Sequence, residues 1–333
     1  MSKARQLADL GNVYDDGALS NRNLIINGAM QVAQRGTSET GKTSAGYYSI
    51  DRFKMDIGSA GTWTISQSTT APDGFAYSFK LDCTAADASL SAGDYCLIQT
   101  RLEGQDLQKL QFGTSSAKKV TISFWVRSNK TGTYPVCFFN TDNQRSNGFT
   151  YTINAADTWE YKTHIFDGDT LQGFDNDANS SVQLEWWVAA GTSFTSGTTP
   201  TGWQAHNNTN RAAGLDVNLA DNTANEFLLT GVQLEIGDTS TPFEHRSYGD
   251  ELARCQRYFW ERQSGRSIYA GDYGSNCFGQ FFFPVTMRAE PTVTATTNKT
   301  VLATYHSQEL IQIYMSGNAG AFTTATLSAD AEL

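Results

Sequence analysis

The stretch from Val120 to Ser128, VTISFWVRS, decides the fold class. Apolar residues occupy every second position from Val120 to Val126, and Thr, Ser, Trp and Arg fill the positions between and after them. Because side chains of a β-strand point alternately to its two faces, this period of two predicts a strand with one face buried and the other turned outward.

Similar patterns recur along the chain up to about residue 245. The segments TWEYKTHIF (158–166), SVQLEWWVAAG (181–191) and FLLTGVQLEIG (227–237) each carry apolar residues on one face, and further strand candidates are 47–57, 62–69, 76–84 and 95–102. Only residues 104–111 suggest a helical turn. Short strands at this spacing, separated by loops rich in Gly, Asn and Thr, predict an all-β fold, namely an antiparallel jelly-roll β-sandwich over residues 21–247.

A different pattern interrupts the strands at ELARCQRYFWER (251–262). Acidic residues lead and arginines trail, as the helix macrodipole favours, and one face of the expected helix carries apolar residues three and four apart. These residues are Leu252, Cys255, Tyr258 and Phe259. We therefore predict a connecting helix over 248–262, followed by a small C-terminal β domain over 263–333, where strand patterns return. Residues 1–20 are expected to form an N-terminal docking arm.

Composition restricts the partners of the chain. Its 333 residues carry a formal charge of −10 at pH 7, which disfavours nucleic acid and an anionic membrane. No segment approaches the ~20 apolar residues of a membrane span, so membrane insertion is not expected, and the N-terminus lacks the apolar region of a signal peptide. We expect synthesis in a cytosol and, from five cysteines without close pairs, free and mostly buried thiols.

Two motifs suggest ligands that need more context than the sequence supplies. GTSETGKT (36–43) matches a phosphate-loop pattern, but a turn and a strand follow it where a helix is required, so we interpret it as a flexible loop. Four carboxylates within a short acidic segment could form a calcium site, and a solvated acidic loop is the alternative. They belong to Asp167, Asp169, Asp175 and Asp177. No other cofactor is expected.

The sequence shows no catalytic motif, and its four histidines are scattered. Carboxylate pairs that cleave glycans are invisible in a sequence, so a catalytic role stays open as an alternative. Trp125 and Trp187 lie opposite the apolar rows of their strands, and Trp203 lies in a loop. With Glu185 and Arg127, they could stack against and hydrogen-bond to sugar rings. The alternative is that these tryptophans belong to the core.

Several stretches resemble the tail-fibre-like virion proteins of marine bacteriophages, cyanophages in particular. They are NRNLIINGAMQVAQRGTS with YYSIDRFKM, ISFWVRS, GVQLEIGDTSTPFEHRSYGDELARCQRYF and FPVTMRAEPTV. The middle region is also similar to jelly-roll carbohydrate-binding modules. The resemblance implies a virion component assembled in the host cytoplasm, trimeric, with a jelly-roll body and a C-terminal tip.

Together these observations predict a homotrimeric phage fibre or fibre-like protein. It would bind host-surface glycan or lipopolysaccharide through the jelly roll, the tip or both, without cleaving it, and other virion proteins through residues 1–20. In a threefold assembly, the apolar face of the helix would meet its copies on the axis, and the arginines would pair with Glu251 and Glu261. The alternatives are a capsid decoration or tail assembly protein that binds only virion proteins, and a glycan depolymerase.

Overall fold

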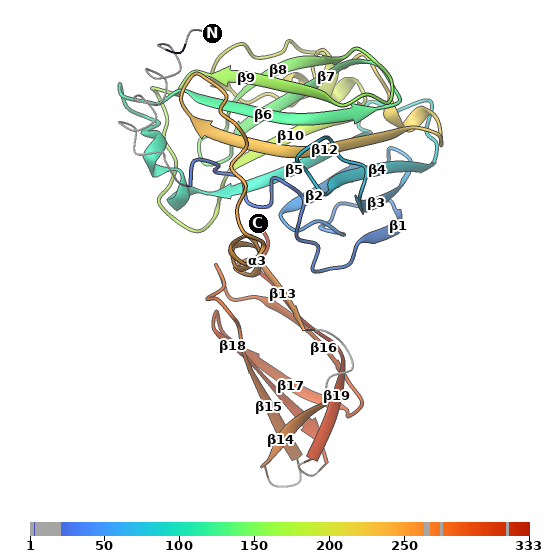
Figure 1. Ribbon diagram of the computed structural model, residues 1–333, viewed down its shortest axis with the longest axis vertical. Coiled ribbons are helices and arrows are strands. Elements are labelled where there is room, and N and C mark those ends of the chain that lie inside the picture. The colour runs from blue at the N-terminus through green and yellow to red at the C-terminus, as the bar shows by residue number, and fades with distance from the viewer. Residues whose placement is uncertain (1–2, 4–20, 263–266, 274–275, 318–319) are drawn as a thin grey trace.

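The computed structural model of the chain describes residue 3 and residues 21–262, 267–273, 276–317 and 320–333. The N-terminal arm predicted for residues 1–20 lies, apart from Lys3, outside the described residues. The fold is all-β with antiparallel sheets, as predicted. A jelly-roll sandwich forms the larger body, and a smaller β domain projects from it beyond the short helix α3 (Tyr248–Gln256; Figure 1).

Two six-stranded antiparallel sheets form the sandwich. The first, called here the β6 sheet, has the order β1 (Ser38–Lys42), β3 (Thr62–Ser68), β4 (Ser78–Ala85), β12 (Glu226–Ile236), β6 (Val120–Ser128) and β9 (Glu160–Phe166). The second, the β10 sheet, has the order β11 (Gln204–Ala205), β8 (Arg145–Ile153), β7 (Gly132–Asn140), β10 (Ser180–Ala190), β5 (Tyr95–Glu103) and β2 (Phe53–Gly58).

The core lies between these sheets and is built from the alternating apolar rows that the sequence predicted. Phe124 of β6 meets Trp186 of β10 edge to face, with ring centroids 5.8 Å apart. Both side chains are fully buried, as are Val182, Leu184 and Leu229 from the same two inner faces. All five cysteines are free and buried, which confirms the prediction made for them.

Short helical segments occupy the connections: η1 (Gly104–Asp106), η2 (Gln108–Leu110), α2 (Thr192–Thr195), η3 (Asn208–Asn210) and η4 (Leu219–Asp221). The helical turn predicted over 104–111 is therefore present. The flexible loop predicted over 36–43 is partly wrong, because β1 pairs with β3 and places Lys42 opposite Trp63. Lys42 thus lies in a strand, and no helix begins there to bind a phosphate.

Helix α3 (Tyr248–Gln256) begins at an N-cap, Ser247, whose hydroxyl accepts a hydrogen bond from the backbone of Asp250 at 3.2 Å. The prediction that the helix extends to residue 262 is wrong. Strand β13 (Phe259–Arg262) starts three residues after the helix ends and pairs with β19 (Gly320–Asp330). Consecutive aromatic residues at 259 and 260 favour a strand, and the pairing with β19 outweighs the local helical pattern. No helix within the described ranges is long and apolar enough to cross a membrane.

The C-terminal sheet contains β13, β14 (Ser267–Tyr273), β15 (Asn276–Phe282), β16 (Thr292–Thr297), β17 (Val301–His306), β18 (Leu310–Ser316) and β19 (Gly320–Asp330). A separate small core forms on one side of it, centred on Ile311, Ile313, Met315 and Leu327. The chain then returns to the helix, so that its C-terminus lies at the junction with the sandwich (Figure 1).

The junction buries the helix face that was expected to meet other copies. Cys255, Tyr258 and Phe259 are buried within the chain itself, and Leu252, the fourth residue of this face, is half-buried. The guanidinium of Arg52 lies 3.4 Å over the ring of Tyr258, and that of Arg35 lies 3.6 Å over the ring of Phe259. The prediction that this face lines a threefold axis is therefore wrong, because the sandwich already covers it.

The arginines of the helix region also have other partners than predicted. Arg257 forms a two-pronged ion pair with the fully buried Glu103, at 2.8 and 3.2 Å. Arg254 donates to the side-chain oxygen of Asn21 at 2.6 Å. Both arginines thus tie the helix to the sandwich, and their predicted pairing with Glu251 and Glu261 is wrong.

Candidate functional site

The tryptophans proposed from the sequence as one sugar-binding surface lie in three different places. Trp125 is on the outer face of the β6 sheet, and Trp187 is on the outer face of the β10 sheet, with the core between them. Trp203 lies in the loop before β11. A single ligand-binding surface made of all three is therefore not formed.

Trp187 and Glu185 are buried under a loop that covers the outer face of their sheet. The loop, residues 191–215, carries Arg211, whose guanidinium bonds the Glu185 carboxylate at 2.5 and 3.2 Å. The indole of Trp187 donates to the same carboxylate at 3.1 Å. Both Trp187 and Glu185 are fully buried, so their predicted contact with a glycan is wrong; together with Arg211 they fasten the loop to the sheet.

Trp203 is half-buried and packs against the end of the sandwich core. Its ring meets Phe138 and Phe112 edge to face, with centroid distances of 4.9 and 5.5 Å. Its indole nitrogen donates to the backbone oxygen of Asp167 at 2.7 Å. Trp203 therefore closes one end of the core, which is the alternative that the sequence left open for the tryptophans.

Trp125, by contrast, belongs to a continuous row of aromatic rings on the outer face of the β6 sheet. We call this set the aromatic row: Tyr161, Trp125, Phe75, Phe243 and His245. Tyr161, 42% exposed, lies beside Trp125 with centroids 5.3 Å apart. Phe75 contacts Phe243 at 5.1 Å and the exposed His245 at 5.2 Å. The row thus extends from the edge strand β9 across β6 and β12 to the segment that follows β12.

Gly231 joins the two halves of the row. It lies in β12 at a break in the register with β6, and its φ of +61° is one that other residues rarely adopt. A Cβ atom at this position would be 2.8 Å from the Phe75 ring and 3.0 Å from the Trp125 ring. Glycine therefore allows these two rings to converge over the strand.

Charges next to the row are balanced. Arg127, the predicted glycan ligand beside Trp125, forms ion pairs with Glu226 and with Asp157, the latter at 2.9 Å. Lys80 bonds the other oxygen of Glu226 at 2.8 Å. Arg127 is thus held at one side of the row by two carboxylates, and the surface around the rings has little net charge.

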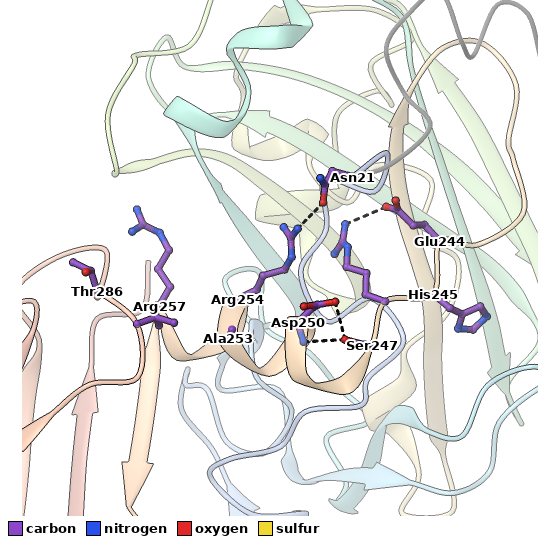
Figure 2. Close-up of a pocket in the computed structure, with 11 residues that line it drawn as sticks. Asn21, Glu244, His245, Ser247, Asp250, Ala253, Arg254, Arg257 and Thr286 are labelled. Atoms are coloured by element: carbon purple, nitrogen blue, oxygen red, sulfur yellow. Dashed lines mark hydrogen bonds and ion pairs between the residues drawn. The ribbon is translucent and has the colours of Figure 1, made fainter.

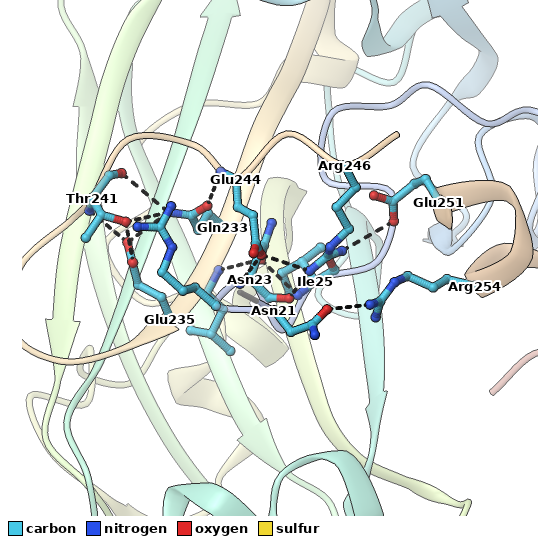
Figure 3. A network of polar contacts seen from close by, with 12 residues as sticks. Asn21, Asn23, Ile25, Gln233, Glu235, Thr241, Glu244, Arg246, Glu251 and Arg254 are labelled. Atoms are coloured by element: carbon cyan, nitrogen blue, oxygen red, sulfur yellow. Dashed lines mark hydrogen bonds and ion pairs between the residues drawn. The ribbon is translucent and has the colours of Figure 1, made fainter. Parts of the chain in front are cut away.

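A polar network holds the segment that carries Phe243 and His245 (Figure 3). The backbone of Thr241 donates to Glu235 at 2.9 Å, and the backbone of Glu244 donates to Gln233 at 2.8 Å. Gln233 and Glu235 are buried on the outer side of β12 beneath this segment. Arg246 continues the network by donating to the backbone oxygens of Asn23 and Ile25. The segment is therefore fixed to both the sheet and the N-terminal residues of the described body.

Four members of the row were missed in the sequence. Phe75, Phe243 and His245 come from loops whose course over the sheet is a tertiary feature, and Tyr161 shares its strand with alternating polar residues. One signal was available: an isolated glycine inside the strand pattern FLLTGVQLEIG marks a bulge or a close approach, and Gly231 is both.

A cleft of about 630 Å³ lies beside α3 (Figure 2). Asn21, Arg254 and Arg257 line it, together with Val285 and Thr286 of the C-terminal domain. Arg257 is paired with Glu103 and Arg246 with Glu244 and Glu251, and Arg254 donates to the side chain of Asn21. The cleft is therefore a polar joint between the two bodies, and its charges do not point to an anionic ligand.

The calcium site suggested by the acidic segment is not formed. Within the part of the chain that the structure describes, no cluster of three or more potential metal ligands occurs. Asp169 is buried against Arg145 at 2.5 Å, Asp167 pairs with Lys119 at 3.0 Å, and Asp177 accepts from Asn179. Asp175 is bonded through its backbone to Asp142. The carboxylates separate because each is engaged in a different local contact.

Comparison with models of protein families found no match, and comparison with curated proteins found none. Among solved structures, the chain is similar to the enzymatically active domain of tailspike protein 4 of bacteriophage CBA120. The sequence identity is 10% and the TM-score is 0.33, and the match covers 65% of this chain and 21% of that one. It is also similar to a putative sugar binding protein from Bacteroides thetaiotaomicron, at 13% identity and a TM-score of 0.35, over 65% of this chain and 100% of that one. A third similar structure is a family 11 carbohydrate-binding module from Clostridium thermocellum, at 11% identity and a TM-score of 0.29, over 60% and 96%.

Proposed function

We propose that the chain binds carbohydrate through the aromatic row, with saccharide rings lying on the outer face of the β6 sheet. The observation that carries the proposal is the convergence of Trp125 and Phe75 over Gly231, flanked by the exposed Tyr161 and His245. Sugar rings present C–H faces that stack on aromatic rings, and their hydroxyls bond to polar groups at the edges. The balanced charges beside the row suit a glycan whose stacked units are uncharged.

We further propose that this binding serves a fibre-like protein on a virion, assembled as a homotrimer and attached to a host surface. Support comes from the resemblance of the stretches that build the joint between the two bodies to phage fibre proteins. The trimer contact would lie elsewhere than on the buried face of α3. Multi-angle light scattering on the full chain tests the oligomer, and a monomer at micromolar concentration would contradict it.

The glycan proposal is tested by affinity electrophoresis in gels containing host polysaccharide, after a glycan array has identified ligands. Trp125→Ala and Tyr161→Ala should abolish the retardation of the protein. Tyr305→Ala is the matched control, because Tyr305 is 59% exposed on the C-terminal sheet, away from the row. Loss of binding in Tyr305→Ala, with binding retained in both row variants, would place the glycan site on the tip domain and refute the proposal.

The same experiment separates the alternative functions. A protein that binds only virion partners would show no retardation in any polysaccharide gel and no array signal. A depolymerase would release reducing ends from the polysaccharide during incubation, which a binding protein does not. We expect retardation without release.

A further inference from the structure

A second cavity opens at the edge of the sandwich between β8 and β9. It has a volume of about 390 Å³ and is separate from the aromatic row and from the cleft beside α3. Strand β8 belongs to the β10 sheet and β9 to the β6 sheet, and the two are not paired with each other in the described sheets. The open edge between the two sheets therefore leaves room for a ligand.

Two stacked rings form one wall of this cavity, which we call the β8–β9 pocket. The ring of Phe149 lies parallel to the imidazole of His164, at a centroid distance of 4.1 Å and an angle of 6°. Burial lowers the pKa of His164, so its ring is neutral at neutral pH. The imidazole makes no hydrogen bond within the described ranges, which leaves one nitrogen able to donate and the other able to accept.

Asn147 supplies a side-chain amide whose nitrogen is free to bond within the pocket. Its side chain is on β8, and the residue is 4% exposed. The amide oxygen accepts from the backbone of Gly148 at 2.8 Å, whereas the amide nitrogen has no partner among the residues that the structure describes. The nitrogen is not among the buried side-chain atoms that lack a partner, so it is in contact with the solvent that fills the pocket. The amide nitrogen is therefore a donor available to a bound molecule.

The other side of the pocket offers acceptors and hydroxyls. Asp167 contributes an exposed carboxylate whose charge is balanced by Lys119 at 3.0 Å. The indole nitrogen of Trp203 donates to the backbone oxygen of Asp167 at 2.7 Å, which fixes the position of the Asp167 backbone. The side chains of Thr150 and Thr201 complete the lining. The pocket thus presents donors and acceptors in similar measure and no unbalanced charge.

We infer that the β8–β9 pocket binds one neutral saccharide unit. Adjacent hydroxyls of a sugar can accept from the Asn147 amide and donate to the Asp167 carboxylate, and the imidazole of His164 can bond a third. The described lining contains no lysine or arginine that could bind an anionic ligand, and a wholly apolar ligand would displace water from the amide without replacing its hydrogen bonds. The volume suits a molecule of this size.

This inference extends the proposed carbohydrate function to a second site, and it does not depend on the aromatic row. Both sites border β9: Tyr161 belongs to the row and Ile165 to the pocket, four residues apart, or about 13 Å along a strand. A branched glycan could therefore lie on the row and place a side unit in the pocket. The two sites can be tested separately.

The test uses the full chain and nuclear magnetic resonance of its side-chain amides. The wild-type protein is titrated in separate samples with glucose, galactose, mannose and N-acetylglucosamine, and the side-chain amide of Asn147 is followed. At least one of these sugars should shift this signal in a saturable manner. If none of them does so, the inference is overturned.

Three variants locate the effect. Thr201→Trp should fill the pocket and weaken binding at least about tenfold, which is about 1.4 kcal/mol. Thr198→Trp, at an exposed position outside the lining, should leave it unchanged. Thr150→Val keeps the side-chain shape, and should weaken binding several-fold even if the larger substitution disturbs folding. A shift that persists unchanged in both Thr201→Trp and Thr150→Val would show that the sugar binds elsewhere.

Trp125→Ala separates this inference from the proposed function. It should abolish retention by polysaccharide through the row, while the Asn147 amide still responds to the monosaccharide. If the response of Asn147 is lost together with retention, the pocket is not an independent site.

Discussion

Replacement of Glu332 by Gln should strongly destabilise the joint between the sandwich and the C-terminal domain. Glu332 is almost buried, at 4% side-chain exposure, and pairs with Arg52, whose side chain is 1% exposed. The guanidinium of Arg52 also donates to the backbone oxygen of Arg101 at 2.6 Å and lies over the ring of Tyr258. Within the described part of the chain, Glu332 provides the only carboxylate bound to Arg52. Glu332 is the penultimate residue, so this ion pair fixes the C-terminus to the sandwich.

The magnitude follows from this burial. Removing one partner of a buried ion pair leaves an uncompensated charge and typically costs about 3–5 kcal/mol. Arg35, which also approaches Glu332 at 3.4 Å, retains Asp51 at 3.6 Å and Asp330 at 3.1 Å, so the loss falls mainly on Arg52. Replacing both members with apolar residues, in Arg52→Met with Glu332→Leu, should restore most of the stability, because no buried charge remains.

Urea unfolding followed by circular dichroism measures the loss, and limited proteolysis reports whether the joint opens first. Glu309→Gln is the control, since Glu309 is exposed in the same domain and should change the free energy of unfolding by no more than about 0.5 kcal/mol. A Glu332→Gln protein within about 1 kcal/mol of wild type would refute the reasoning. So would a double variant as unstable as the single one, because the cost would then not come from an unpaired Arg52.

Three further predictions concern other parts of the molecule. Gly231→Ala should lower the free energy of unfolding by about 1–2 kcal/mol, because a Cβ is disfavoured at its φ of +61°. It should also weaken polysaccharide retardation, because the new methyl group would push Phe75 away from Trp125. Unchanged retardation would contradict the role given to the aromatic row. Arg211→Met should leave the buried carboxylate of Glu185 without its ion-pair partner. Hydrogen exchange should then accelerate over residues 192–215 but not in β12. Equal protection of the loop in both proteins would show that other contacts fix it to the sheet. Burial raises the pKa of Asp51 from 3.8 to about 6. Between these two pH values the folded chain retains a proton that the unfolded chain has released, so the free energy of unfolding falls as the pH rises. At about 1.36 kcal/mol per pKa unit, the fall amounts to up to about 3 kcal/mol. Asp51→Asn should remove this fall in urea unfolding measured from pH 4 to pH 6, and an identical pH dependence in both proteins would assign it to other groups.

The strands could be predicted from the sequence because their signal is local. The segments 120–128, 181–191 and 227–237 match β6, β10 and β12 within a residue at each end, since burial on one face imposes a period of two. The end of α3 could not be predicted, because β13 forms only by pairing with β19 about seventy residues later. A helical pattern and a strand pairing compete there, and only the second depends on distant residues.

The alternation of apolar and polar residues showed which side chains point to the outer faces of the sheets. It did not show which segments of the chain cover those faces. Trp125 and Trp187 were both correctly placed opposite the apolar rows, yet one lies in an aromatic row and the other is fully buried. The difference arises from Arg211, which carries a loop onto the β10 sheet through its bond to Glu185. Nothing in the local pattern of either strand distinguishes the two cases.

Two of the stretches from which a fibre protein was predicted meet at the joint. Asn23, from NRNLIINGAM, receives a hydrogen bond from Arg246, and the backbone of Asn27 donates to Glu251 at 2.6 Å. Arg246 and Glu251 both belong to the stretch that begins with GVQLEIG. These residues bind the segment that begins at Asn21, the end of β12 and the start of α3 to one another (Figure 3).

That arrangement also links the aromatic row to the C-terminal domain. The segment that supplies Phe243 and His245 continues through Arg246 into α3, and α3 is fixed to the sandwich by Arg257 and Glu103. The C-terminal domain is fixed in turn by Arg52 and Glu332. Because both arginines are charge-paired with buried carboxylates, we expect the row and the domain to keep a constant orientation.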